Sequence, residues 1–272
     1  MTGDAGPEVV PGASGLDTAT PNAARIYDYL LGGKDNYAAD RQAAERVLRA
    51  LPDAALVARA NRAFMADAVR QVAGFGITQF IDIGTGLPTP PSVHECARSA
   101  IPDARVAYID NDPVVIAHSR ALLATDDLLT VIDGDARDSK AILADPQLTA
   151  LIDLAEPVCV MFAGILHFVT PAQADDAVAT FRDAMAPGSY LVISAGHGNE
   201  RSSPEEGKIQ AAYGGKATLT GRPAAEFAAY FDDFELVPPG LVPVTDWPAV
   251  ARASPSTPTK AEMLVGIGRK PA

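Results

Sequence analysis

The chain has 272 residues, of which 48% are hydrophobic, and its formal net charge is −12 at pH 7. This length can form one large α/β domain with extensions. The acidic charge, with no cluster of Lys and Arg, disfavours DNA or RNA as a partner, because a phosphate backbone requires a basic surface. No apolar run approaches the roughly 20 residues needed to span a bilayer, and no secretory signal is visible, so we expect a cytoplasmic protein without a membrane partner.

Cysteine and histidine usage excludes two further kinds of site. Cys96 and Cys159 are far apart and each lies in an apolar pattern, which predicts buried free thiols in a reducing compartment. His94, His118 and His197 share no metal-ligand spacing with one another or with the remaining histidine. We therefore expect neither a disulfide nor a metal site.

The N-terminal quarter of the chain is predicted to be a leader followed by helices. Residues 1–19 are rich in Gly, Pro, Ala, Thr and acidic residues and lack periodicity, which predicts a disordered leader. Thr20-Pro21 resembles an N-cap followed by proline at the first helical position, and Gly32-Gly33 is expected to end that short helix. Two further helical patterns follow at 37–50 and 53–73.

Short apolar runs and helical stretches alternate from residue 77 onward. Uniformly apolar runs that alternate with helices predict a doubly wound, mostly parallel, seven-stranded sheet within an α/β domain. The domain is expected to span 77–272, with insertions at 196–221 and 238–260. The expected strands are 77–83, 105–110, 128–132, 158–163, 189–195, 234–237 and 262–268. The expected helices are 91–100, 112–123, 138–151, 171–186 and 222–231.

The first expected strand ends in an acidic residue and a glycine turn. Ligands of a doubly wound sheet bind at the carboxyl ends of its strands, so Asp82, Gly84 and Gly86 are expected to line the site. A dinucleotide fingerprint needs Gly-x-Gly-x-x-Gly, but Thr89 occupies the third glycine position and the neighbouring prolines remove N–H donors. The Asp82 carboxylate suits an ammonium group better than a pyrophosphate. The turn therefore favours S-adenosylmethionine over a dinucleotide, with a purely structural turn as the alternative.

Three further strand ends carry groups that suit a nucleoside. Asp110 lies where a carboxylate can accept hydrogen bonds from both ribose hydroxyls, a feature shared by NAD and S-adenosylmethionine sites. Asn111 is a candidate adenine contact, and Asp135 with the backbone N–H of Ala136 could bind the adenine amino group and ring nitrogen. Ala163 ends the fourth strand, which faces the reacting part of the cofactor. The structural alternatives are a helix cap, a turn and an Asp-rich loop.

Few residues are candidates for catalysis. His167 follows the fourth strand and could be a general base, with a structural or pocket-lining role as the alternative. Near the Gly-Gly pair, Arg25 could hold a cofactor carboxylate, Tyr29 could place its ring against a sulfonium, and Tyr37 is a second candidate base. The alternative is a helix that packs its tyrosines into the core and pairs Arg25 with Asp28.

Several segments resemble a known family. The order of elements and the strand ends resemble class I S-adenosylmethionine-dependent methyltransferases, and more narrowly the actinobacterial S-adenosyl methyltransferase family formerly of unknown function. The segment Tyr-Asp-Tyr-Leu-Leu-Gly-Gly at 27–33 is highly specific. Residues 90–92 depart from the family, which tends to carry a glycine and an asparagine there. The matching segments are 21–22, 25–37, 58–62, 82–89, 93–95, 108–113, 165–168 and 186–190.

The resemblance implies a fold, a cofactor and a reaction class. It implies a Rossmann-like methyltransferase fold in which residues 20–76 form a helical cap over S-adenosylmethionine. We expect a methyltransferase that acts on a small-molecule acceptor, and the oligomeric state stays open. One alternative is a protein that binds the cofactor without turnover, and the other is an NAD(P)-dependent oxidoreductase. The implied cofactor set is Asp82, Gly84, Gly86, Asp110, Asn111, Asp135 and Ala136.

Overall fold

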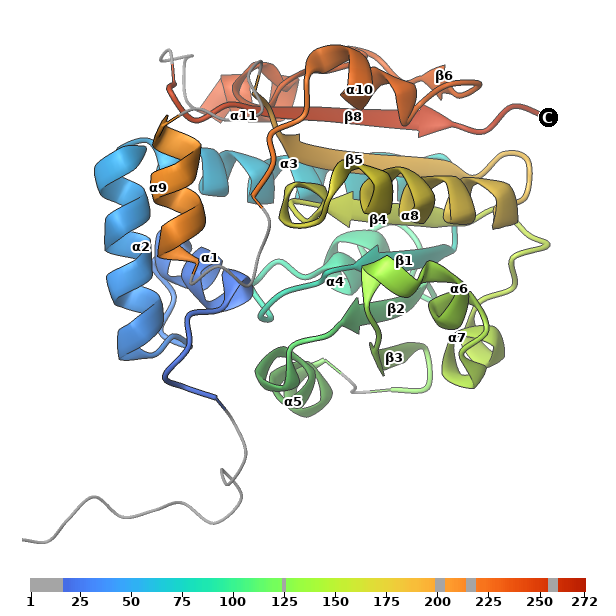
Figure 1. Ribbon diagram of the computed structural model, residues 1–272. Helices are drawn as coiled ribbons and strands as arrows, with labels where there is room; N and C mark the ends of the chain where they lie inside the picture. The colour runs from blue at the N-terminus through green and yellow to red at the C-terminus, as the bar shows by residue number, and fades with distance from the viewer. Residues whose placement is uncertain (1–16, 124–125, 199–203, 214–218, 254–258) are drawn as a thin grey trace, which may run out of the picture.

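The computed structural model describes residues 17–123, 126–198, 204–213, 219–253 and 259–272. Within them, one sheet has the strand order β3-β2-β1-β4-β5-β8-β6, with β7 also paired to β8 (Figure 1). The strands are β1 (Gln79–Ile83), β2 (Arg105–Asp110), β3 (Leu129–Asp133), β4 (Cys159–Ala163), β5 (Tyr190–Gly196), β6 (Glu235–Leu236), β7 (Val242–Pro243) and β8 (Met263–Arg269). The helices are α1 (Ala23–Leu31), α2 (Ala38–Ala50), α3 (Ala54–Gly74), α4 (Val93–Arg98), α5 (Pro113–Leu122), α6 (Ser139–Leu143), α7 (Pro146–Leu151), α8 (Pro171–Ala184), α9 (Pro204–Ala212), α10 (Ala224–Ala229) and α11 (Pro248–Ala253), with short 3₁₀ helices η1 (Ala136–Asp138), η2 (Leu166–Phe168) and η3 (Val244–Asp246).

The predicted doubly wound, mostly parallel sheet is confirmed, but it has eight strands in the described residues rather than seven. Strands β1 to β5 run parallel, and β8 pairs antiparallel with β5. The additional strand, β7, consists of Val242 and Pro243 and lies within the predicted insertion at 238–260. Two residues are too few to produce an alternating pattern, so the sequence could not reveal it.

Burial on both faces explains why the parallel strands are continuous apolar runs. On one face, α3, α4 and α11 pack around a cluster that includes Phe64 and Trp247, whose rings meet edge to face at 4.9 Å. On the other face, α6, α7, α8 and α10 pack around Phe162, Phe181 and Phe227. The predicted helix at 138–151 is two helices, because Asp145 caps a new helix that starts with Pro146.

A separate layer, which we call the cap layer, consists of α1, α2 and α9 and lies across the carboxyl ends of the parallel strands (Figure 1). Its apolar contacts include Ile26, Val47 and Ile209. Helix α1 is capped by Asn22, whose side chain accepts a hydrogen bond from the Ala24 N–H at 2.7 Å, and not by the predicted Thr20 with Pro21 as first helical residue. It ends at Gly32 with a φ of 86°, as predicted.

Two helices alter the layout expected for residues 20–76. Most of α3 packs on the sheet through residues such as Phe64 and Val69, while its first turns join the cap layer through Ala54 and Ala58. Helix α9 lies in the predicted insertion at 196–221 and completes the cap layer. Of the predicted leader, residues 1–16 lie outside the described residues.

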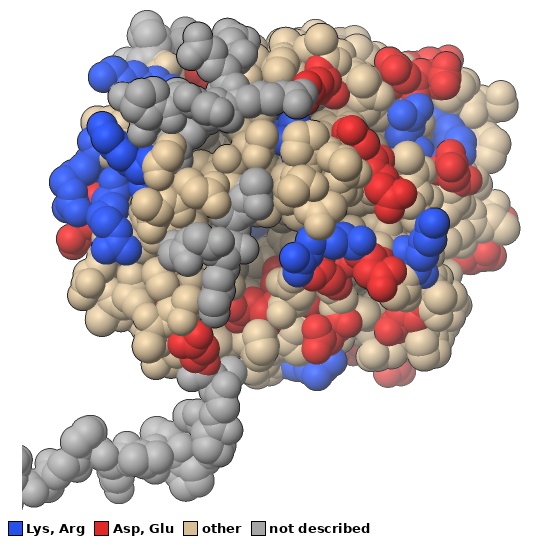
Figure 2. All heavy atoms as spheres, in the orientation of Figure 1, with Lys and Arg blue, Asp and Glu red and all other residues tan. Residues whose placement is uncertain are grey.

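Three further features concern membrane spans, the cysteines and the surface charge. Among the described helices, none combines the length and the apolar character that crossing a membrane requires. Cys96 and Cys159 are both buried free thiols, as predicted. On the face shown in Figure 2, acidic and basic residues are mixed over most of the surface, while Lys and Arg gather at one edge over α2.

Candidate functional site

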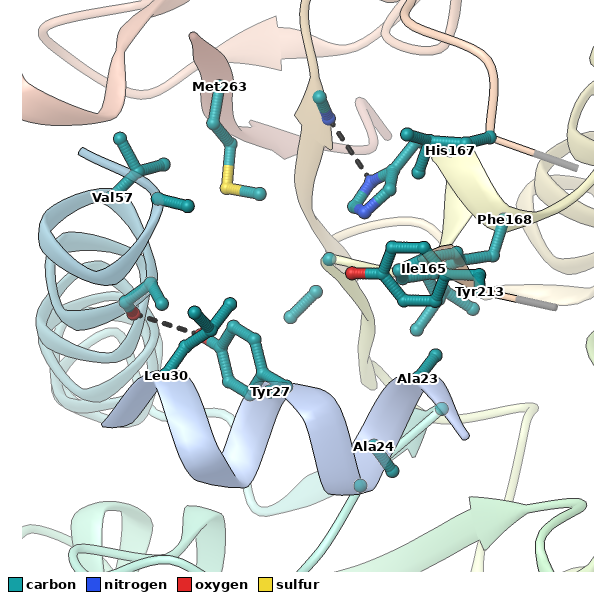
Figure 3. Close-up of a pocket in the computed structure, with 18 of the residues that line it drawn as sticks. Ala23, Ala24, Tyr27, Leu30, Val57, Ile165, His167, Phe168, Tyr213 and Met263 are labelled. Atoms are coloured by element: carbon teal, nitrogen blue, oxygen red, sulfur yellow. Dashed lines mark hydrogen bonds between the residues drawn. The ribbon is translucent and has the colours of Figure 1, made fainter. Parts of the chain in front are cut away.

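A cavity of about 1080 Å³ opens where the parallel strands end. Strand ends line it through residues such as Gly84 and Asp110, and α1 lines it through Tyr27 and Leu30. Figure 3 shows these two α1 side chains across the opening from His167. Pockets for one small ligand measure about 300–1,000 Å³, so this cavity is at the upper end of that range, and its lining runs from the strand ends to the cap layer.

The glycine turn after β1 brings the backbone close to this cavity. Gly84 and Gly86 have φ angles of 71° and 66°, which side-chain-bearing residues rarely adopt. A Cβ on Gly84 would lie 2.2 Å from Cγ2 of Ile165, whereas a Cβ on Gly86 would meet no atom within 4 Å. Gly84 is therefore required by packing, and Gly86 leaves open space at the edge of the cavity.

Alanine at Gly84 is expected to destabilise the fold more than alanine at Gly86. Both substitutions introduce strain at positive φ, but only the first adds overpacking, which typically costs about 1–3 kcal/mol. We expect the free energy of unfolding to differ between the two variants by that amount, as measured by urea denaturation. Equal stability of Gly84→Ala and Gly86→Ala would show that Ile165 moves aside at no cost.

Asp110 is held at the edge of the cavity by backbone donors. Its Oδ2 accepts a hydrogen bond from the Gly86 N–H at 2.9 Å, and its Oδ1 accepts one from the Asp112 N–H at 3.0 Å. Burial raises the pKa of the Asp110 carboxyl, and these hydrogen bonds partly offset that effect. Each carboxylate oxygen retains a lone pair for a further donor, which is what a ribose diol requires.

The predicted adenine residues come together on the same side. Asn111, Asp135 and Ala136 line the cavity, and the Asn111 Nδ2 donates to Asp135 Oδ2 at 3.1 Å. Arg137 forms an ion pair with Asp135, and this hydrogen-bonded pair lowers the pKa of the Asp135 carboxyl to about 2. Asp135 is therefore ionised at neutral pH, and an amino group would share its oxygens with the side chains of Arg137 and Asn111.

Asp82 lies one layer behind the lining of the cavity. It is 2% exposed, and its Oδ2 accepts a hydrogen bond at 2.8 Å from the hydroxyl of Thr85, which does line the cavity. Its Oδ1 is buried without a hydrogen-bond partner among the described residues. Burial raises the pKa of Asp82 to about 6. A buried carboxylate oxygen without a partner is costly unless a positive charge lies nearby. Asp82 beside Thr85 therefore suits a cationic group in the cavity.

Ala163 and His167 both line the cavity, as the sequence suggested. The Nδ1 of His167 accepts a hydrogen bond from the Gly196 N–H at 3.2 Å (Figure 3). Burial, and less strongly Arg222, lower the pKa of His167 to about 4, so the ring is neutral at pH 7 with its proton on Nε2. In this arrangement Nε2 is a hydrogen-bond donor and carries the proton that a general base would have to lack, so the predicted role of His167 as a base stays a prediction.

Arg25 does not lie in the lining of the cavity. It is 2% exposed, and its Nε lies 3.2 Å from Oδ2 of Asp40. Its two Nη atoms donate to the backbone carbonyls of Asp17 at 3.0 Å and Thr20 at 2.7 Å. These contacts occupy the guanidinium, so the predicted role at a cofactor carboxylate is wrong; the predicted alternative partner, Asp28, is not its partner either.

Tyr29 and Tyr37 also lie outside the lining. Tyr37 lies at the start of α2. The guanidinium carbon of Arg25 lies over its ring, 5.3 Å from the ring centroid. Tyr29 packs against the apolar cluster of the cap layer. The structure therefore places neither the predicted ring beside a sulfonium nor the predicted second base at the cavity.

Among the lining residues that the sequence reasoning missed are Arg62, Tyr213 and Met263. Arg62 donates to the carbonyls of Thr89 at 2.5 Å and Pro91 at 3.0 Å. Its segment, 58–62, is one that matches the family, which was a usable signal. Tyr213 and Met263 carried no such signal, because both follow stretches that lack a readable periodicity.

In the part of the chain that the structure describes, no three His, Cys, Asp or Glu side chains are grouped so that they could hold a metal ion.

The sequence matches the model of the S-adenosyl methyltransferase family over residues 11–271. The chain belongs to this family. The cofactor of this protein is S-adenosylmethionine, and the strand-end residues described above fit that molecule.

Solved structures agree with the family assignment. A Thermobifida fusca protein, provisionally described as a methyltransferase, is 39% identical over 97% of this chain and 100% of its own, with a TM-score of 0.85. A DUF574 family protein from Streptomyces avermitilis is 38% identical over 94% of this chain and 99% of its own, with a TM-score of 0.86. No protein with a curated function matches the chain.

Proposed function

We propose that this family member transfers the methyl group of S-adenosylmethionine to a small molecule. One observation carries the proposal: a single cavity has nucleoside-type polar groups along the strand ends and additional space lined by the cap layer. When bound, the cofactor would supply a methyl group on a sulfonium. A lone pair of the acceptor would form the new bond to the methyl carbon, the electron pair of the broken C–S bond would return to sulfur to leave S-adenosylhomocysteine, and the positive charge would pass to the acceptor, which releases a proton to solvent where it carries one.

The strand-end residues have distinct proposed roles toward the cofactor. Asp110 accepts hydrogen bonds from the ribose hydroxyls, and Asp135 with the Ala136 N–H binds adenine. Asp82 acts through Thr85 on the ammonium group. Arg62 replaces Arg25 as the candidate for the carboxylate, because its guanidinium lines the cavity and a single nitrogen, Nη2, holds both of its backbone carbonyl partners.

The residues of the chain contribute mainly by holding two molecules in place. Methyl transfer from a sulfonium requires an in-line approach of donor and acceptor, and fixed geometry can supply much of the rate enhancement. The cap layer and the strand ends enclose the two ligands from opposite sides. The competing proposal, binding without turnover, predicts tight cofactor binding but no product with any acceptor in a broad panel.

Calorimetric titration with S-adenosylmethionine, S-adenosylhomocysteine and NAD tests the cofactor site. We expect the two sulfur compounds to bind, and Asp110→Ala to weaken them about 10- to 100-fold, since charge-assisted hydrogen bonds are worth about 1.5–3 kcal/mol. Asp133→Ala is the matched control, because Asp133 is the register partner of Asp110 on β3 but is exposed outside the lining. Binding of NAD alone, or equal affinity in both variants, would refute the assignment.

A further inference from the structure

The part of the cavity next to the cap layer, which we call the acceptor chamber, is lined mainly by carbon. Its side chains come from five different elements and converge on one opening (Figure 3). Such a lining binds a ligand through burial of apolar surface. The side chains that define the chamber are Leu30 on α1, Val57 on α3, Phe168 on η2, Ile209 on α9 and Met263 on β8.

The charged groups of the described lining lie at the nucleoside end, already have partners or are exposed to solvent. A charged ligand moved into an apolar chamber would lose its hydration without gaining a counter-ion, which costs several kcal/mol or forces neutralisation. The ligand of the chamber should therefore be uncharged. The charged lining residues are Asp110, Asp135 and Arg137 at the nucleoside end, Arg62 with its two carbonyl partners, and Lys260 and Glu262, which are exposed.

His167 supplies a directional polar group within the chamber. Because Nδ1 accepts from the Gly196 N–H, the neutral ring presents its Nε2–H as a donor. Arg222, which is 1% exposed, fixes the segment that carries His167 by donating to the carbonyls of Leu166 at 2.8 Å and Val169 at 3.0 Å. The donor is therefore held in a fixed position.

Tyr213 supplies a second neutral polar group. Figure 3 shows its hydroxyl directed into the opening, and its ring packs on Phe168 with centroids 5.2 Å apart. Burial raises the pKa of this hydroxyl, so it stays protonated. The Tyr27 hydroxyl, in contrast, is engaged by the Ala58 carbonyl at 2.9 Å and the Asn61 amide at 3.1 Å. Among the described residues of the chamber, the Nε2–H of His167 and the hydroxyl of Tyr213 are thus both neutral polar groups.

We infer that the methyl acceptor is an uncharged, largely apolar small molecule bearing a hydrogen-bond-accepting atom, which the Nε2–H of His167 orients as a positioning residue. This inference rests on the proposed function, but it concerns the acceptor chamber and not the cofactor residues. It assigns His167 a role in orienting the acceptor that does not involve proton removal. The acceptor atom must then have a lone pair available without help from this histidine.

Three naphthalene probes of similar size test the chemistry of the chamber in the full chain with S-adenosylhomocysteine present. They are 2-acetonaphthone, which is neutral with a carbonyl, 2-ethylnaphthalene, which is neutral without one, and 2-naphthoate, which is charged. We expect 2-acetonaphthone to bind at least tenfold more tightly than 2-naphthoate. Equal or tighter binding of 2-naphthoate, or no binding of either neutral probe, would overturn the inference.

A substitution pair locates the binding. Val57 is 7% exposed and lines the chamber, whereas Leu122 is 58% exposed and lies outside it. Val57→Asp should weaken 2-acetonaphthone at least tenfold, and Leu122→Asp should leave its affinity unchanged. Equal effects of both variants would place the probe elsewhere. Calorimetry with S-adenosylhomocysteine on the same samples separates this result from failure of the proposed function, which would abolish cofactor binding instead.

Nitrogen-15 NMR of the imidazole rings tests the role of His167 without relying on a mutant fold. We expect the His167 signal, assigned by its loss in His167→Asn, to show a neutral ring protonated on Nε2 at pH 7. Addition of 2-acetonaphthone should shift the Nε2–H resonance, and 2-ethylnaphthalene should shift it much less. A ring protonated on Nδ1, or equal shifts with both probes, would contradict the positioning role.

Discussion

Replacing Arg25 with methionine is expected to lower the free energy of unfolding by about 3–5 kcal/mol, because it leaves a buried carboxylate without its partner. Arg25 and Asp40 are 2% and 0% exposed, and Nε lies 3.2 Å from Oδ2. That contact is too bent for a good hydrogen bond, so the attraction between the two groups is chiefly electrostatic. Urea denaturation followed by the fluorescence of Trp247, the single tryptophan, measures the effect.

Two variants separate this structural role from a role in cofactor binding. Asp40→Asn combined with Arg25→Met removes both charges and keeps an acceptor oxygen for one of the two N–H groups, of Asn22 and Tyr37, that donate to Asp40, so it should recover part of the lost stability. Arg49→Met, at an exposed position of α2, should change stability by less than about 0.5 kcal/mol. If Arg25→Met had the same free energy of unfolding as Arg49→Met but bound the cofactor more weakly, the predicted contact of Arg25 with the cofactor carboxylate would be supported.

Between pH 4 and pH 7 the cofactor-free protein is expected to lose up to about 3 kcal/mol of stability relative to its Asp82→Asn variant. Burial raises the pKa of Asp82 from 3.8 to about 6. At pH 4 the folded protein keeps this carboxyl protonated and uncharged. The uncharged amide of Asp82→Asn mimics that form. Between about pH 4 and pH 6 the unfolded chain has released this proton while the folded state still holds it, so stability falls and then levels off above pH 6. Urea titrations of both proteins across this range measure the difference.

Cofactor affinity should show the opposite dependence on pH. An ammonium group in the cavity favours the ionised form of Asp82, so S-adenosylmethionine should bind up to about tenfold more tightly at pH 7 than at pH 5. The Asp82→Asn variant should bind with nearly the same affinity at both values. A parallel pH dependence in wild type and variant would show that another group is responsible.

The sheet could be predicted from the sequence because its central strands are apolar along their whole length. All five residues of β1 are buried, and so are the first four of β4. Apolar runs this short are typical of parallel strands that are covered on both faces. Helix α9 could not be predicted in the same way. Its buried Ile209 packs against the cap layer, so its position depends on tertiary contacts with α2 and not on its own periodicity.

The cofactor half of the site was predictable for a geometric reason. Carboxyl ends of parallel strands meet at one edge of a sheet, so Gly84, Asp110 and Asp135 had to lie close together. The cap half was not predictable, since Arg25 has the chemistry both to bind a carboxylate ligand and to pair with Asp40. The choice depends on how α1 and α2 pack, which the sequence pattern of either helix alone does not encode.

The pairing of α2 with α9 has a consequence for how the protein is made. The Arg46 side chain donates to the Ala212 carbonyl, a contact that spans 166 positions of the chain. At about 5–20 residues per second, a ribosome completes that interval in roughly 10–30 s. Until then Ala43 and Val47, buried in the finished protein, have no α9 to cover them. The nascent N-terminal helices thus emerge early and acquire their final neighbour late, and their apolar faces stay uncovered by α9 during that interval.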